Sequence, residues 1–185
     1  MNNFFPSIVR SENELLQIHQ LNKENLRSVI NPEEQTSEGF VSWLYSMELL
    51  KKMHAVAPSI IVKDETKIAG YALVALKEMV AFHTDLQTLF SHLLQLRYLN
   101  QPLSHFTFYC MGQICVDKDY RGMGVTKMLY EKHKEVYSSS YQLLVTEIST
   151  SNIRSQKPHE KVGFKPIHNY RDDLDEWNVV VWDWR

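Results

Sequence analysis

The N-terminal third of the chain carries apolar residues at the spacing of helices. Ser11 opens a Ser-Glu-Asn-Glu pattern typical of a capping box, and apolar residues follow it at helical intervals up to Ile30. Asn31-Pro32 is a second helix start, because proline is favoured at the first helical position, and another apolar stripe follows it. The pattern predicts a first helix up to about Ile30 and a second helix from Asn31 to about His54.

Later stretches of the chain have the same helical period. Between Thr84 and Tyr98, leucines and a phenylalanine recur at i, i+3, i+4, i+7 and i+8, which places them on one face of a helix. Further helices are predicted at Val125–Tyr137, directly after a glycine loop, and at Asn152–Val162.

Short runs rich in β-branched and aromatic residues separate these helices and predict strands. The predicted strands are Ser7–Arg10, Ser59–Lys63, Lys67–Lys77, Phe106–Val116, Leu143–Ile148, Lys165–Asn169 and Trp177–Trp184. The run IAGYALVAL in the third of them is apolar on both faces, which is typical of a central strand. Antiparallel pairs together with one strand–helix–strand crossover predict an α/β (mixed α+β) sandwich built on a mixed sheet.

Composition and charge narrow the class of protein. The chain of 185 residues has ordinary hydrophobic and charged shares, and we expect one domain over residues 1–185. The net charge of −2 gives no basic surplus for wrapping a nucleic acid. The two cysteines are too few for a disulfide framework, and neither an export signal nor a membrane-spanning run is visible. We therefore expect a cytoplasmic protein that binds neither nucleic acid nor membrane.

The most informative stretch is QICVDKDYRGMGVTKML, where a predicted strand leads through a glycine loop into a helix. The first amides of a helix have no intrahelical partner, and the helix dipole adds positive charge there. Such a loop suits a phosphate or pyrophosphate, and Arg121 adds a cation. Three interpretations are open: a turn whose glycines serve geometry alone, a loop that binds a dinucleotide such as NAD(P), and a third that rests on a family resemblance.

The dinucleotide interpretation matches the loop only in part. Gly122 and Gly124 supply two of its glycines, and Glu147 lies at the spacing of its acidic residue. Lys127 stands where the third glycine belongs, and only one strand–helix–strand unit is predicted. The Walker-type phosphate loop is absent, because the chain has no GxxxxGK followed by serine or threonine.

The third interpretation rests on two motifs. Arg121–Thr126 resembles the cofactor motif R/Q-x-x-G-x-G/A of the GNAT superfamily of acyl-CoA-dependent N-acyltransferases, with threonine at the last position. Asn152–Phe164 is similar to the family's later motif N-x-x-A-x-x-L/F-Y-E-K-x-G-F. In that second motif, serine, proline and histidine stand for the alanine, the apolar residue and the tyrosine. One helix and one strand separate the two motifs, as in the family.

The resemblance implies a fold and an activity. The fold is the GNAT fold, a central mixed, largely antiparallel twisted sheet flanked by helices, here with an extra helix inserted at about 84–98. The activity is transfer of an acetyl or other small acyl group from acetyl-CoA to a primary amine, by direct attack in a ternary complex and without a metal. The acceptor is a small-molecule or peptide amine. The inserted helix has three roles open to it: a cap on the acceptor groove, a homodimer contact, or cover for one face of the sheet.

The resemblance also implies which residues contact acetyl-CoA. The strands on either side of the glycine-loop helix separate in this superfamily, and the pantetheine arm lies between them. The implied cofactor-binding residues are Ile114, Cys115 and Val116 through their main chain, Arg121, Gly122, Met123, Gly124, Val125 and Thr126 around the pyrophosphate, and Asn152 and Ser155 beside the arm.

Three side chains are candidates for proton transfer. His159 stands where the family commonly has a tyrosine that protonates the leaving thiolate, and a histidine is suited to a general acid. The alternative is an exposed histidine beside Pro158. Glu147 on the following strand is a candidate base, with a solvated strand-end residue as the alternative. Tyr109 is a further candidate, because it neighbours the position of the glutamate that some members use.

Two further features bear on the activity. Thr126 and His159 depart from the family pattern, so a CoA-binding domain that has lost catalysis and serves regulation or assembly is an alternative to the enzyme. Cys110 and Cys115 lie five residues apart on one predicted strand, so we expect their side chains on opposite faces. That placement argues against a disulfide or a metal site between them.

Overall fold

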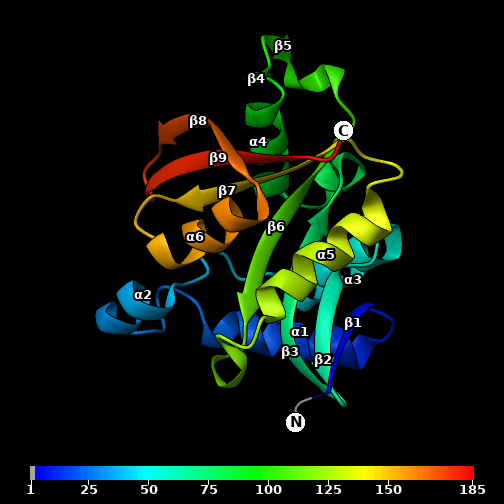
Figure 1. The fold of residues 1–185 in the computed structure, drawn as a ribbon, viewed down its shortest axis with the longest axis vertical. Coiled ribbons are helices and arrows are strands. Elements are labelled where there is room, and N and C mark those ends of the chain that lie inside the picture. Colours follow the sequence, from blue (N-terminus) through cyan, green and yellow to red (C-terminus); the bar gives the residue numbers. More distant parts are fainter. Residues whose placement is uncertain (1–2) are drawn as a thin grey trace.

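The computed structural model describes residues 3–185, which form one large sheet with helices on both faces (Figure 1). The strands are β1 (Phe4–Ile8), β2 (Ile60–Asp64), β3 (Lys67–Ala75), β4 (Arg97–Tyr98), β5 (Gln101–Pro102), β6 (Phe108–Val116), β7 (Leu143–Ser149), β8 (Lys165–Arg171) and β9 (Glu176–Asp183). The α-helices are α1 (Glu12–Glu24), α2 (Pro32–Glu38), α3 (Met47–Val56), α4 (Thr84–Leu93), α5 (Val125–Tyr137) and α6 (Ile153–Val162). Short 3-10 helices span Lys77–Phe82, Leu103–His105 and Lys118–Tyr120.

The large sheet has seven strands in the order β1-β2-β3-β6-β7-β9-β8. Every neighbouring pair is antiparallel except β6 and β7, which are parallel. In β3 every residue from Ile68 to Ala75 is buried, which confirms the expectation of a central strand. The mixed, mostly antiparallel sheet flanked by helices is the predicted fold class.

The parallel pair of strands is interrupted. β6 and β7 pair only at Phe108–Cys110 against Leu143–Val145, although both strands continue. Beyond that point β6 stays paired with β3, and β7 stays paired with β9. Figure 1 shows β6 turning away from β7, so the sheet forks at its centre, as the family resemblance implies.

The helices divide between the two faces of the sheet. α5 and α6 lie on one face, whereas α1, α3 and α4 lie on the other (Figure 1). The core is continuous through both layers and includes buried residues of α5, the central strands and α4. Within residues 3–185, no helix combines the length and hydropathy needed to cross a bilayer.

The prediction of one continuous helix from Asn31 to about His54 is wrong. The chain forms two helices there, α2 and α3, with an extended segment between them. Gly39 ends α2 with a φ of 81°, and the Ser46 hydroxyl caps α3. The buried Asn22 side chain holds the segment extended, because it donates to the Trp43 carbonyl at 3.0 Å and accepts from the Tyr45 amide at 2.9 Å. Apolar spacing does not reveal such a partner from α1.

The first predicted strand and helix are displaced in the same region. β1 begins and ends earlier than the predicted Ser7–Arg10. The capping box at Ser11 is confirmed, but α1 stops at Glu24, and the residues up to Ile30 lie in turns. Leu26 forms a parallel bridge with Val41 in the extended segment after α2, and this pairing replaces the predicted continuation of α1.

The inserted helix is present but shorter than predicted. α4 buries Leu86, Phe90 and Leu93, which are on the predicted apolar face. Tyr98 is not helical; it belongs to β4, which pairs with β5 in a small hairpin. The hairpin turn at Leu99 and Asn100 has positive φ values of 49° and 62°.

A bulge in β6 corrects the expectation about the cysteines. Leu73 pairs with Gln113 and Val74 pairs with Met111, so Gly112 is an extra residue on β6. Cys110 and Cys115 therefore pair with Ala75 and Tyr71, which are four residues apart on β3. The two cysteines share one face of the sheet, contrary to the prediction from simple alternation. Both are buried as free thiols.

Gly112 provides a test of the packing at the bulge. A Cβ added there would lie 2.6 Å from the Tyr45 hydroxyl oxygen. We expect Gly112→Ala to lower the free energy of unfolding by about 1–3 kcal/mol through overpacking. Tyr45→Phe removes the clashing oxygen, so the double variant should lose less than the sum of the single losses. Urea denaturation of the four proteins measures this, and strictly additive losses would contradict the predicted contact.

Candidate functional site

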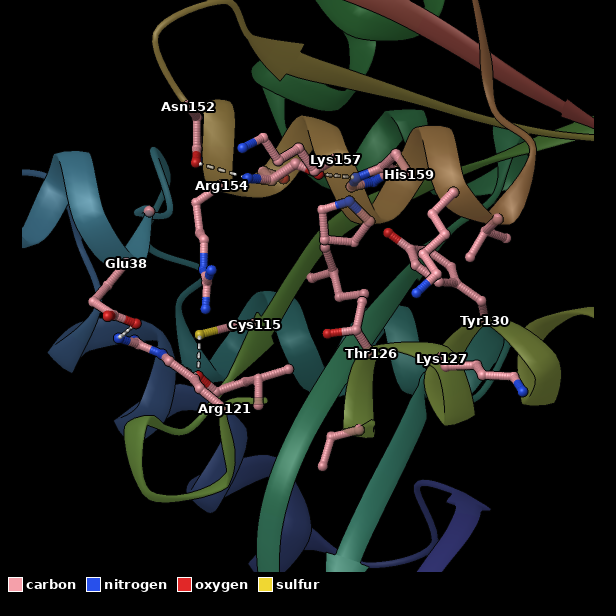
Figure 2. Close-up of a pocket in the computed structure, with 18 of the residues that line it drawn as sticks. Glu38, Cys115, Arg121, Thr126, Lys127, Tyr130, Asn152, Arg154, Lys157 and His159 are labelled. Carbon is pink, nitrogen blue, oxygen red and sulfur yellow. Dashed lines mark hydrogen bonds and ion pairs between the residues drawn. The ribbon is translucent and has the colours of Figure 1, made fainter. Parts of the chain in front are cut away.

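A cavity of about 790 Å³ lies beside the fork in the sheet (Figure 2). It is bordered by the end of β6, the loop into α5, one side of α6 and the residues that follow α2. Met123 is the one predicted cofactor residue outside the lining. The predicted residues that line the cavity are Ile114, Cys115, Val116, Arg121, Gly122, Gly124, Val125, Thr126, Asn152 and Ser155.

The start of α5 is left without a side-chain cap. Gly124 is the N-cap residue, in the left-handed region at φ 85°, and no side chain of residues 3–185 accepts from the first turn. By contrast, a side-chain atom accepts from the first turn at α1, α2, α3, α4 and α6. The first amides of α5 are therefore open donors at the positive end of the helix dipole, on the wall of the cavity.

The two glycines of the loop serve backbone conformation. Gly122 has a φ of 78° and Gly124 a φ of 85°, values that residues with a Cβ adopt at a cost. A Cβ at either position would have no atom of the described residues within 4 Å, other than those of the glycine and its chain neighbours, so these sites are not crowded by them. Open space beside unpaired amides is the arrangement that an anion needs for close approach.

Arg121 is held by the protein. Its guanidinium donates to Glu38 Oε2 at 3.1 Å (Figure 2). It also donates to Asn25 Oδ1 at 2.7 Å, and the Nε donates to the Val116 carbonyl at 3.3 Å. Glu38 is the last residue of α2, so this ion pair fastens α2 to the glycine loop. The carboxylate of Glu38 also places a negative charge beside the cavity.

Asn152 fastens α6 to the same segment. Its side-chain oxygen caps α6 by accepting from the Ser155 amide at 3.2 Å, and its side-chain nitrogen donates to the Phe40 carbonyl at 2.9 Å. A Cβ on Gly39 would lie 2.8 Å from that oxygen, so glycine is also needed there for close approach. Asn152, the first residue of the second motif, thus has a structural role in the lining of the cavity, where it joins α6 to the segment after α2.

Basic side chains gather around the cavity. Arg154 extends from α6 toward β6, and Lys157 lies one turn further along the same helix (Figure 2). Acidic lining residues are Glu38, which is paired with Arg121, and Glu131, which is paired with Lys127 at 3.6 Å. The basic lining residues are Arg121, Lys127, Arg154, Lys157 and Lys161.

His159 lines the cavity but is buried, with 2% of its surface exposed. Its Nδ1 lies 2.7 Å from the Ser155 carbonyl, to which it donates, so Nε2 carries the lone pair. Burial lowers the pKa of His159 to about 4, and the imidazole is therefore neutral at pH 7. A neutral ring with this tautomer has no proton on Nε2 to give, which does not suit the predicted general acid. The alternative of an exposed histidine is also wrong.

Tyr130 lies beside His159 and was missed by the sequence analysis. Its ring centroid is 5.4 Å from that of His159, and its buried hydroxyl has no hydrogen-bond partner in the part of the chain that the structure describes. The sequence signal is weak, because a tyrosine in the middle of α5 has the spacing of an ordinary core residue. Tyr130 and His159 together give the cavity wall unpaired polar atoms between α5 and α6.

Glu147 lies at the fork but does not line the cavity. It follows Val145, the last residue of β7 that pairs with β6, by two positions. Its carboxylate accepts from the Tyr170 hydroxyl at 3.0 Å and lies 3.3 Å from His92 Nδ1 of α4, so it is on the face of the sheet opposite α5 and α6. Burial raises the pKa of Glu147 to about 7. The alternative of a solvated strand-end residue is wrong, because only 18% of the Glu147 side chain is exposed.

Tyr109 is not at the site. It lies in the paired part of β6, opposite Leu144, and is fully buried. Its hydroxyl is 2.8 Å from His133 Nδ1, and its ring packs against Tyr137 and Trp184. In this aromatic cluster Tyr109 packs in the core and does not line the cavity. The prediction of Tyr109 as a catalytic candidate is therefore wrong.

Comparison with known proteins relates this geometry to a family. The profile of the acetyltransferase (GNAT) family matches residues 15–164. Similar solved structures include the NatC complex bound to Gag peptide and CoA, with a TM-score of 0.66, 12% identity and 99% of both chains covered. Ard1 from Thermoplasma volcanium has a TM-score of 0.63, 12% identity and 97% coverage of both chains. Arabidopsis thaliana Naa50 in complex with the bisubstrate analogue CoA-Ac-MVNAL has a TM-score of 0.64 and 15% identity, with 98% of this chain and 99% of that chain covered.

These comparisons carry different weight. No match is found among curated proteins. At 12–15% identity the solved structures establish the fold, including the mostly antiparallel sheet flanked by helices. The family profile extends over most of the chain and includes both motifs. The chain therefore belongs to the acetyltransferase (GNAT) family.

Proposed function

We propose that this chain is an N-acetyltransferase that moves an acetyl group, or another small acyl group, from acetyl-CoA to a primary amine in a ternary complex. The observation that carries the proposal is the uncapped start of α5, which opens onto a cavity beside the fork of β6 and β7. The helix start suits a diphosphate, and the fork exposes main-chain groups to an extended arm. Similar structures determined with CoA or a CoA-containing analogue support the choice of donor.

The lining residues fit acetyl-CoA as the donor. The amides of Gly122, Gly124, Val125 and Thr126 would hold the pyrophosphate, with Arg154 and Lys157 as further cations. Within residues 3–185, the main-chain groups of Ile114–Val116 on the side facing β7 have no strand partner, although the Val116 carbonyl accepts from Arg121 Nε; these groups would hold the pantetheine arm. When bound, acetyl-CoA supplies the thioester carbonyl that the amine attacks. Holding both reactants in one geometry is worth about 7–11 kcal/mol of barrier.

Glu147 is the proposed general base. The amine approaches from the α4 face, and Glu147 takes the proton that its nitrogen releases as the new C–N bond forms. A carboxylate with a pKa of about 7 is half ionised at neutral pH and is a stronger base than an ordinary glutamate. Unpaired main-chain amides of β6 beyond Cys110 would polarise the carbonyl under attack.

His159 has no proton-transfer role in this proposal. A thiol with an ordinary pKa of about 8.5 leaves readily as a thiolate near neutral pH, and water can protonate it afterwards. The hydrogen bond from Nδ1 to the Ser155 carbonyl instead holds His159 in the wall between α5 and α6.

The acceptor is a primary amine on a small molecule or a peptide. Two of the similar structures contain peptide sequences, the Gag peptide of the NatC complex and the MVNAL analogue of Naa50. A peptide N-terminus is therefore the first acceptor class to test, followed by polyamines, amino acids and aminoglycosides.

The proposal is tested by binding and turnover together. We expect calorimetry to detect acetyl-CoA binding and a free-thiol assay to detect release with at least one amine class. Gly124→Asp places a carboxylate at the uncapped helix start, and Gly124→Asn is its neutral match; both residues tolerate positive φ better than most. The aspartate variant should bind acetyl-CoA about tenfold more weakly than the asparagine variant, through repulsion of the diphosphate.

Three results would redirect the proposal. Equal affinity of the two Gly124 variants would remove the helix start from the site. Acetyl-CoA binding without thiol release across the amine panel would favour the catalytically inactive CoA-binding domain. Binding of NAD(P) in place of acetyl-CoA would favour the dinucleotide interpretation.

The ion pair between Arg121 and Glu38 gives a second prediction. The Glu38 carboxylate holds the guanidinium and repels an incoming diphosphate, so Glu38→Gln should strengthen acetyl-CoA binding. The pair is partly exposed, and we expect a decrease in Kd of about two- to fivefold. Glu33→Gln, on the exposed side of α2, is the control and should leave Kd unchanged. Weaker binding in the Glu38 variant would show that the pair supports the site instead of restraining it.

The pH dependence gives a third prediction. Glu147 must be ionised to accept a proton, so kcat/KM should rise with pH through an apparent pKa of about 7 and then level. Glu147→Gln should lower kcat about 100-fold or more and abolish this limb, with KM for acetyl-CoA unchanged because Glu147 lies outside the cavity. A Glu147→Gln protein with an unchanged pH profile would exclude Glu147 as the base.

A further inference from the structure

The inserted helix α4 brings a histidine to the fork in the sheet. His92 Nδ1 lies 3.3 Å from Glu147 Oε1, and the Tyr170 hydroxyl of β8 donates to Glu147 Oε2 at 3.0 Å. Each oxygen of the carboxylate therefore has its own partner, one from α4 and one from β8. The two partners also contact each other, with ring centroids 4.3 Å apart in an edge-to-face arrangement.

The position of His92 is fixed by the packing of its helix. Leu86, Phe90 and Leu93 of α4 are buried in the core, with exposures of 2% or less. Leu93 directly follows His92 in sequence, so the anchored face of the helix determines where the imidazole lies. A shift of α4 would need to break this apolar contact, which makes the helix a rigid support for the side chain.

The charged and titratable groups around the carboxylate come from several elements. α4 contributes His92, and β8 contributes Tyr170 together with His168, whose ring is 5.6 Å from that of His92. Asp172, after β8, raises the pKa of Glu147, and Cys110 of β6 is close enough to feel its charge. Burial lowers the pKa of His92 below its ordinary value of 6.5, so its imidazole is neutral at neutral pH. The neutral imidazole can donate from Nδ1 to the ionised carboxylate.

Partial exposure distinguishes this cluster from a sealed core network. The side chains of His92 and Glu147 are 26% and 18% exposed, so the carboxylate is accessible from the α4 face. By comparison, the polar pair of Tyr109 and His133 is fully buried and reaches no surface. The His92 cluster has the combination of fixed partners and access that a proton acceptor needs.

We propose that His92 is a positioning residue: from the inserted helix α4 it donates a hydrogen bond to Glu147 and, with Tyr170, holds that carboxylate toward the acceptor side of the fork. The inference rests on the proposed function, since it assigns the helix a role in that reaction. It selects the first of the three roles open to the inserted helix, because α4 becomes part of the acceptor side of the site.

The first arm of the test measures Glu147 directly and needs no acceptor. The protein is labelled with ¹³C at glutamate side-chain carboxyls, and the Glu147 signal is assigned by its loss in Glu147→Gln. His92→Phe keeps a ring and removes the donor, so the midpoint of the Glu147 titration should rise by about one pH unit. Tyr170→Phe should raise it in the same direction, and His92→Asn, which keeps a donor, should restore part of the shift. His168→Phe is the matched control and should leave the midpoint unchanged, because the His168 ring packs against the rings of His92 and Tyr170.

The second arm follows turnover with acetyl-CoA and whichever amine class releases thiol. His92→Phe should lower kcat at pH 7 about fivefold and move the rising limb by the same amount as the titration, with KM for acetyl-CoA unchanged. An unchanged Glu147 midpoint in His92→Phe, or a loss of kcat that is uniform with pH and accompanied by a lower Tm, would overturn the positioning role. Absence of thiol release from the unaltered protein would contradict the proposed function alone, since the titration arm would still report on His92.

Discussion

The interruption between β6 and β7 determines the rest of the site. After Cys110 and Val145 the two strands no longer pair, and the Thr146 hydroxyl donates to the Met111 carbonyl at 2.8 Å at the fork. The bulge at Gly112 then redirects β6, while β3 and β9 keep both strands in the sheet. The gap thus opens without loosening the core. The uncapped start of α5 lies on one side of the sheet at this gap, and Glu147 and α4 lie on the other.

The groups on both sides of the gap lower the stability of the fold. An unfilled N-cap forgoes about 1 kcal/mol that a serine or asparagine cap provides elsewhere. Burial raises the pKa of Glu147 from 4.5 to about 7, so the folded state holds this proton more tightly than the unfolded state. The protonated Glu147 side chain therefore favours the folded state fully below about pH 4.5, and this contribution to the free energy of unfolding is lost as pH rises through 7. Such local losses are typical of residues retained for chemistry.

The sequence predicts those features that depend on local pattern. The glycine loop before α5, the second motif at α6 and the apolar face of α4 all occupy their predicted elements. Two predictions failed because they depend on partners elsewhere in the fold. Asn22 of α1 holds the chain extended where one continuous helix was predicted, and the bulge at Gly112 places Cys110 and Cys115 on the same face of β6. Burial decides the roles of His159 and Glu147, and spacing along the chain does not report burial. His92 was not identified because its partner lies 55 residues away.

Amide hydrogen exchange reports on the main chain of the fork itself and shows whether CoA binds there. Exchange is followed by mass spectrometry with and without saturating CoA. The account predicts slower exchange in two segments at once, residues 112–116 of β6 and residues 122–126 at the start of α5, with α1 unchanged. Binding of CoA that slows exchange in neither segment, or no binding at all, would contradict the account.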